Sequence, residues 1–159
     1  MAQAPQQPAY QAPGGGGPSG PRAGFWRRFG AALIDGIIIG IVASIISAIL
    51  GGAERFSATY QGINALLALI YYAYLEGGET GQTLGKKALG IRVIDFGAGG
   101  PIGYGRAALR NIGSYLSGIV IGIGYLWMLW DPEKQTWHDK FANSVVVPAE
   151  AYPVGPTGA

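Results

Sequence analysis

Residues 29–50 form an apolar run in which Asp35 is the only charged residue. As a helix this run would be roughly 33 Å long, enough to cross a bilayer core of ~30 Å. The alternative is a buried helix of a soluble protein, but the length of the run and the scarcity of charge both oppose it. The run therefore predicts a membrane-spanning helix.

Two further apolar segments follow. Residues 58–75 are a shorter candidate span that includes Gln61 and Asn64, so we expect neighbouring helices to shield it. Residues 111–130 contain no Asp, Glu, Lys or Arg. Together the three segments predict an all-α membrane protein with about three transmembrane helices. The glycines of the third segment leave a second arrangement open, in which it bends back as a re-entrant hairpin.

Composition supports the membrane prediction and narrows the function. Charged residues make up 13% of the chain, about half the share that is usual in soluble domains. The net charge of +2 gives no indication of nucleic-acid binding, and the absence of cysteine excludes disulfides and thiolate chemistry. We find no nucleophile–base pair, metal-ligand cluster or cofactor loop, so the sequence predicts a non-catalytic protein without metal or cofactor.

Both ends of the chain predict disorder. Residues 1–23 are rich in Pro, Gly, Gln and Ala and cannot bury enough apolar area to offset the entropy of ordering them. Residues 148–159 read as a second loose tail. The predicted membrane domain therefore covers residues 24–147.

Basic residues predict the orientation. Arg22, Arg27 and Arg28 precede the first span, which places the N-terminus in the cytoplasm. The connection 76–110 carries five Lys or Arg residues and is expected on the same side. We expect a multi-pass protein of the plasma membrane, with the side of the C-terminal tail left open.

Arg28 and Asp35 lie seven positions apart and therefore on one helix face. A carboxylate within a span costs roughly 2.5–3.5 kcal/mol on insertion scales, and such residues are usually functional. Arg28 is offset by roughly 10 Å along the axis, so Asp35 needs a partner on another helix. Arg110 is the predicted partner, and Tyr71, Tyr72 and Asn111 could donate hydrogen bonds to Asp35. Asp35 is then either one half of a helix-locking ion pair or an ion or proton site.

The loop 78–95 superficially suggests a phosphate-binding loop. However, Thr80 stands where the first glycine should be, and Lys87 replaces the Ser or Thr that would hold magnesium. The loop is predicted instead to be a cytoplasmic amphipathic stretch that contacts anionic lipid headgroups through Lys86, Lys87 and Arg92. His138, the only histidine, precedes Asp139, and a structural contact between them is favoured over catalysis.

Four segments together, at 24–40, 81–95, 106–110 and 129–147, resemble the RDD family of small membrane proteins. That family is named after one arginine and two aspartates, which Arg28, Asp35 and Asp139 match. The Pro- and Gly-rich N-terminal tail is similar to that of actinobacterial members. The resemblance implies an integral membrane protein, and transport, with cation/proton exchange as one candidate, is a role proposed for the family.

Two functions follow as hypotheses. The first is transport of ions or small solutes, with Asp35 as the intramembrane site. Three helices enclose little space, so a transport path would require a homo-oligomer or a membrane protein partner. Residues of small side chain at every fourth position, such as Gly36, Gly40 and Ser44, would allow close helix packing. The alternative is a membrane scaffold or accessory protein that binds partners through its tail or its basic loop.

Overall fold

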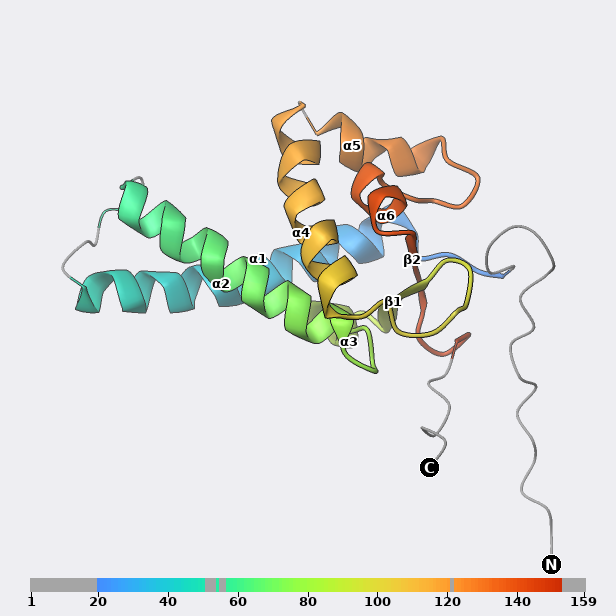
Figure 1. Cartoon of the computed structure of the whole chain (residues 1–159), viewed down its shortest axis with the longest axis horizontal. Coiled ribbons are helices and arrows are strands. Elements are labelled where there is room, and N and C mark those ends of the chain that lie inside the picture. Colours follow the sequence, from blue (N-terminus) through green and yellow to red (C-terminus); the bar gives the residue numbers. More distant parts are fainter. Residues whose placement is uncertain (1–19, 51–53, 55–56, 121, 153–159) are drawn as a thin grey trace, which may run out of the picture.

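The computed structural model describes residues 20–50, 54, 57–120 and 122–152. The elements, in chain order, are the helices and strands labelled in Figure 1: α1 Phe25–Ile49, α2 Ala58–Gly77, α3 Leu84–Ala88, β1 Ile91–Asp95, α4 Tyr104–Ile119, α5 Ile123–Leu126, the 3-10 helix η1 Trp127–Leu129, α6 Trp137–Phe141 and β2 Ser144–Pro148. Most of the predicted tail segments, 1–19 and 153–159, lie outside the described residues.

Helices α1 and α2 form a long hairpin that extends to one side of the molecule (Figure 1). Within the described ranges, α1 is the one unbent helix that is long and apolar enough to cross a membrane by itself. Its buried face carries Ala31, Asp35, Ile39, Ala43 and Ser47 at every fourth position. Its outer face carries large apolar residues with the same spacing, each more than half exposed: Leu33, Ile37, Ile41 and Ile45. Small residues inside and large apolar residues outside are typical of a helix that packs in lipid.

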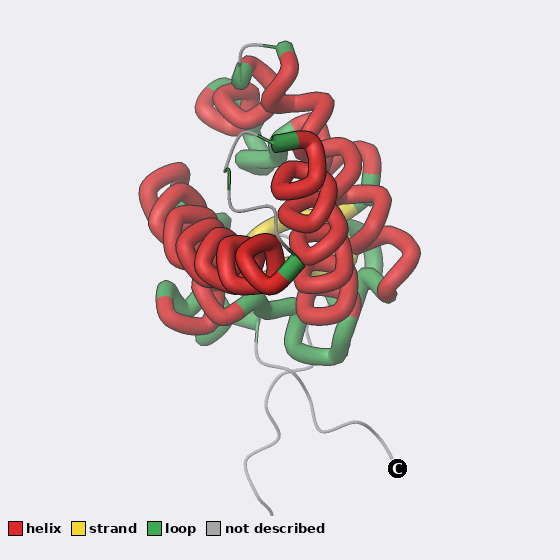
Figure 2. The backbone as a smooth tube through the Cα atoms, turned by 90° about the vertical axis from the view of Figure 1, so that its left-hand side faces the viewer, coloured by secondary structure: helices red, strands yellow, loops and turns green. Residues whose placement is uncertain are grey.

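Strands β1 and β2 form an antiparallel ladder in the register Ile91↔Pro148 to Asp95↔Ser144. Figure 2 looks at the hairpin from its tip and shows these strands behind the helices. The prediction of an amphipathic lipid-facing stretch over 78–95 is therefore wrong in its second half. The physical reason is the β-branched composition of the two segments, which favours a strand once a partner strand is present.

The third predicted span is not one straight helix. Helix α4 ends at Ile119, and the segment is bent by 113° between α4 and the pair α5–η1. Gly122 has a φ of +70°, a left-handed conformation that glycine adopts without strain. Because β1 and β2 pair across this segment, the chain must return to the side from which it left. The segment 111–130 is therefore bent and not one straight helix, and a broken span and a re-entrant loop both have this shape.

The predicted tail boundaries are also wrong by a few residues. Ala23 is fully buried, and its N–H donates to Val146 O over 3.0 Å. The Arg22 guanidinium forms an ion pair with Glu133 and donates to the Tyr152 hydroxyl over 2.9 Å. Residues 20–23 and 148–152 thus belong to the packed domain, because they extend the edge of the strand ladder.

Truncation at the N-terminus checks this revised boundary. Removing residues 1–19 leaves every contact named above intact, so we expect an unchanged melting temperature in detergent. Removing residues 1–23 loses the Ala23 backbone hydrogen bond and the Arg22 ion pair, and should lower the melting temperature by several degrees. Equal melting temperatures for the two truncated proteins would contradict the packing of residues 20–23.

Candidate functional site

Asp35 is fully buried and connects α1 to α2 and to the loop before α3. Its Oδ1 accepts hydrogen bonds from the Tyr71 hydroxyl at 2.7 Å and from the Gly85 N–H at 2.8 Å. Its Oδ2 accepts from the Thr83 hydroxyl at 2.6 Å. We call Asp35 with these three donors the aspartate anchor. The predicted pairing of Asp35 with Arg110 is wrong, because neutral donors occupy both carboxylate oxygens and Arg110 binds elsewhere.

The close approach of α3 to α1 depends on Gly85. A Cβ atom at this position would lie 2.2 Å from the Ala31 backbone oxygen and 2.9 Å from the Asp35 carboxylate. Only glycine lets the two backbones come this near. Thr83 serves two purposes here, since its hydroxyl binds Asp35 and also accepts from the Lys86 N–H, which caps α3.

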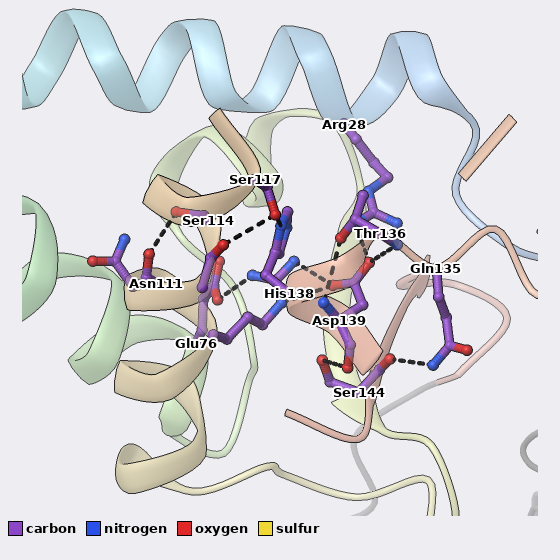
Figure 3. A network of polar contacts seen from close by, with 12 residues as sticks. Arg28, Glu76, Asn111, Ser114, Ser117, Gln135, Thr136, His138, Asp139 and Ser144 are labelled. Carbon is purple, nitrogen blue, oxygen red and sulfur yellow. Dashed lines mark hydrogen bonds and ion pairs between the residues drawn. The ribbon is translucent and has the colours of Figure 1, made fainter. Parts of the chain in front are cut away.

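A continuous chain of ion pairs joins α1, α2, α3, α4 and α6, and we call it the charge chain. Arg28 binds Asp139, and Figure 3 shows Arg28 reaching from α1 toward that carboxylate. Arg110 donates from Nε to Asp139 Oδ1 over 2.8 Å and pairs through Nη1 with Glu76. Lys86 Nζ binds the other oxygen of Glu76 at 2.6 Å. Two carboxylates thus bridge three cations.

Lys86, Lys87 and Arg92 were predicted to contact lipid headgroups from one loop, and for Lys86 this prediction is wrong. Lys86 is 7% exposed and lies 5.3 Å from the centre of the Tyr72 ring, so it faces Glu76 and the interior and not the outer surface. Lys87 is exposed, and Arg92 lies on β1, half-buried, with an Nε that has no hydrogen-bond partner. The three residues do not share one surface, because α3 is a five-residue helix followed directly by a strand.

Asp139 is held by its own helix as well as by the arginines. Its carboxylate accepts from the Thr136 N–H at 3.0 Å, and its N–H donates to the Thr136 hydroxyl at 3.3 Å, which together form a capping box. Burial alone would raise the pKa of Asp139, but the guanidinium groups of Arg28 and Arg110 outweigh it and hold this pKa well below its usual range. Asp139 is therefore a carboxylate at neutral pH.

His138 is neutral in the folded protein. Burial lowers its pKa to about 3, and the nearby guanidinium groups of Arg110 and Arg28 act in the same direction against the charge of Asp139. The His138 ring packs on Tyr125 with centroids 4.9 Å apart, and its Nδ1 lies 3.4 Å from the Ser117 hydroxyl (Figure 3). Within the described residues, no group of three or more His, Asp and Glu side chains is arranged to hold a metal ion.

The low pKa of His138 predicts a loss of stability in weak acid. An unfolded histidine has a pKa near 6.5, so between this value and about 3 the unfolded state binds one more proton. The free energy of unfolding should then fall by up to about 1.4 kcal/mol for each pH unit below 6.5. Asp139 contributes its own loss only below about pH 4, because that is where an unfolded aspartate begins to protonate. Between pH 6.5 and 4.5, the melting temperature of His138→Asn should fall less than that of the parent protein. Equal falls would contradict the conclusion that a neutral, buried His138 causes the acid sensitivity.

A cavity of about 500 Å³ opens beside the charge chain. Its apolar wall comes from α1, α5 and η1 through Phe25, Phe29, Leu126 and Met128. Its polar wall comes from the start of α1 and from α2, α3, α4 and α6, and includes Arg28, Glu76, Lys86, Arg110, Asn111 and His138. Arg28, Arg110 and His138 are thus brought together at one cavity, Asp139 lies behind them, and the aspartate anchor is a separate site.

Several residues of these two sites escaped the sequence analysis. Glu76 was assigned no role, although it stands at the end of a candidate span, where a charged residue could have been questioned. Thr83 and Gly85 carry no local pattern that indicates a partner 48 to 50 positions away, whereas the hydrogen bond predicted from Tyr71 to Asp35 is confirmed.

A family model of the RDD family matches residues 22–143. The chain is 31% identical to the uncharacterized protein YxaI of Bacillus subtilis (strain 168), over 79% of this chain and 96% of that protein. It is 29% identical to the uncharacterized membrane protein YteJ of the same strain, over 82% of this chain and 83% of that protein.

The chain also matches the proline-rich antigen of Mycobacterium leprae (strain TN), with 35% identity over 52% of this chain. It spans about a third of that protein's length, since the match covers 34% of it. No solved structure matches the chain.

Proposed function

The chain belongs to the RDD family, and we propose that it is an integral, non-catalytic membrane protein that binds a small solute or ion as a step of transport. The observation that carries this proposal is the cavity of about 500 Å³ bounded by charged side chains at the head of the apolar helix α1. The binding site is thereby assigned to this cavity and not to Asp35, whose two oxygens already accept hydrogen bonds.

The proposed topology is an α1–α2 hairpin that crosses the plasma membrane twice, with α4 and α5 as a re-entrant segment. The N-terminal start of α1, strand β1 and strand β2 lie together, as the hydrogen bond from Ala23 to Val146 and the strand ladder require. Basic residues favour the cytoplasm for this side. Since two crossing helices enclose little space, a path through the membrane is proposed to need at least a second copy.

Thiol labelling tests this topology. Single cysteines are introduced at two exposed positions, Lys87 in the cytoplasmic part and Glu54 between α1 and α2. An impermeant thiol reagent added to intact cells should label Glu54→Cys and leave Lys87→Cys unlabelled until the cells are opened. The opposite pattern would reverse the orientation, and labelling of both in intact cells would exclude the hairpin.

Transport itself is tested by flux in liposomes that contain only this protein, with sodium, potassium, chloride and phosphate as candidate ions. Ala32 is exposed and lines the cavity, so Ala32→Trp should obstruct it without touching the charge chain. Leu33→Trp, on the outer face of α1, is the matched control. We expect flux with the parent and the Leu33 variant and a large loss with the Ala32 variant. Equal flux in all three would remove the cavity from the transport path.

A membrane scaffold is the second candidate function. It is favoured by the extent of the charge chain and the aspartate anchor, which tie five helices into a rigid unit. The scaffold would be supported over the transporter if liposomes with a high density of protein showed no flux of any of the four ions. The melting temperature of the reconstituted protein should then equal that of the purified protein, which shows that the protein is folded.

A further inference from the structure

We propose that the cavity takes the headgroup of an anionic lipid that also carries hydroxyl groups, of the chemistry found in phosphatidylglycerol. This inference rests on the proposed function for the cavity as the binding site, and it names a lipid headgroup as the ligand class in place of a free solute or ion.

The walls of the cavity fit an amphiphile. Phe25, Phe29 and Leu126 give it an apolar side, and the charge chain gives it a polar side. Phe29 and Leu126 are also 53% and 38% exposed on the molecular surface, so the mouth opens beside residues that would face acyl chains. A headgroup can therefore reach the polar side while its chains stay in the bilayer.

The polar side presents positive charge. The side chains of Glu76 and Asp139 are 0% exposed, so neither carboxylate presents accessible surface to a ligand, although Glu76 borders the cavity. The side chains of Arg28, Lys86 and Arg110 keep 8 to 10% of their surface exposed. Each of the three cations has more N–H donors than its ion pairs use, since a guanidinium has five and an ammonium three. A phosphodiester anion would accept hydrogen bonds from the unused donors.

Asn111 requires a hydrogen-bond donor in the same ligand. The residue lines the cavity and is 7% exposed, and its Oδ1 is buried without a hydrogen-bond partner. A buried acceptor without a partner costs free energy, so such an atom often marks a missing ligand. A glycerol hydroxyl can donate to Oδ1, whereas the quaternary ammonium of a choline headgroup has no N–H or O–H to donate.

Melting temperatures of the purified protein in a neutral detergent test the proposal. Short-chain phosphatidylglycerol is compared with phosphatidylcholine of the same chain length and with glycerol 3-phosphate, which has the anion and hydroxyls but no chains. We expect a saturable rise in melting temperature with phosphatidylglycerol and a much smaller one with the other two. Equal effects of the two lipids would overturn the proposal. An effect of glycerol 3-phosphate equal to that of phosphatidylglycerol would show that the cavity binds a free anion. That result would overturn the lipid proposal and leave the proposed function standing.

Variants distinguish binding in the cavity from a non-specific attraction of anionic lipid to basic side chains. Asn111→Leu removes an acceptor that has no protein partner, so the fold should be retained while apparent affinity for phosphatidylglycerol falls about tenfold, the loss expected for one hydrogen bond. Lys87→Gln, which removes an exposed positive charge outside the cavity lining, is the matched control and should bind as the parent does. Ala32→Trp, which obstructs the cavity, should abolish the effect. Unchanged binding in both cavity variants would overturn the proposal, whereas specific binding without ion flux would refute transport alone.

Discussion

Replacing Asp139 with asparagine should destabilise the protein by about 3–5 kcal/mol, the usual cost of removing one partner from a buried charge pair. The side chain of Asp139 is 0% exposed and binds both Arg28 and Arg110. Asparagine has nearly the same shape but no charge, so two buried guanidinium groups would lose their shared counter-ion. The measurement is chemical or thermal unfolding in detergent, with Glu79→Gln as an exposed control that should change little.

A double-variant cycle shows whether the effect comes from the ion pair. Arg28→Met alone strands part of the Asp139 charge, whereas Arg28→Met with Asp139→Asn removes one cation together with the anion. We therefore expect the double variant to lose less stability than the sum of the two single losses, by about 0.5–3 kcal/mol. Additive losses would mean that the two residues do not interact in the folded protein.

Replacing Gly85 with alanine should be comparably damaging, at about 3 kcal/mol, the upper end of what overpacking costs. The added Cβ would lie 2.2 Å from the backbone oxygen of Ala31, and backbone atoms cannot move aside as a flexible side chain can. Helix α3 would have to move away from α1, and the hydrogen bonds of Thr83 and Gly85 to Asp35 would be lost. The same unfolding measurement applies.

Gly62→Ala is the matched control for this change. Gly62 lies within α2, and no other group lies within 4 Å of the Cβ that alanine would add there. Alanine is the better helix former by about 1 kcal/mol, so this variant should be as stable as the parent or more so. If Gly85→Ala were equally harmless, the close approach of α3 to α1 would be refuted.

The sequence by itself determined the features that depend on local composition. The uninterrupted apolar run at 29–50 gave the position of α1 to within a few residues, because a helix of that length and hydropathy has few other environments. Asp35 was predicted to have a role because it is the only charged residue in that run. The glycines of 111–130 indicated that this segment could bend back. The family motifs pointed to Arg28 and Asp139 as important residues.

Only the tertiary structure decided how these residues are paired. Asp35 binds donors 36 to 50 positions away, Arg110 binds Glu76 and Asp139 on two other helices, and the residues of β1 pair with residues 49 to 57 positions later. Such partners are chosen by which segments meet after packing, and a one-dimensional pattern contains no distances between them. The strands were missed for the same reason: a five-residue β-branched segment becomes a strand only when another edge is there to accept its hydrogen bonds.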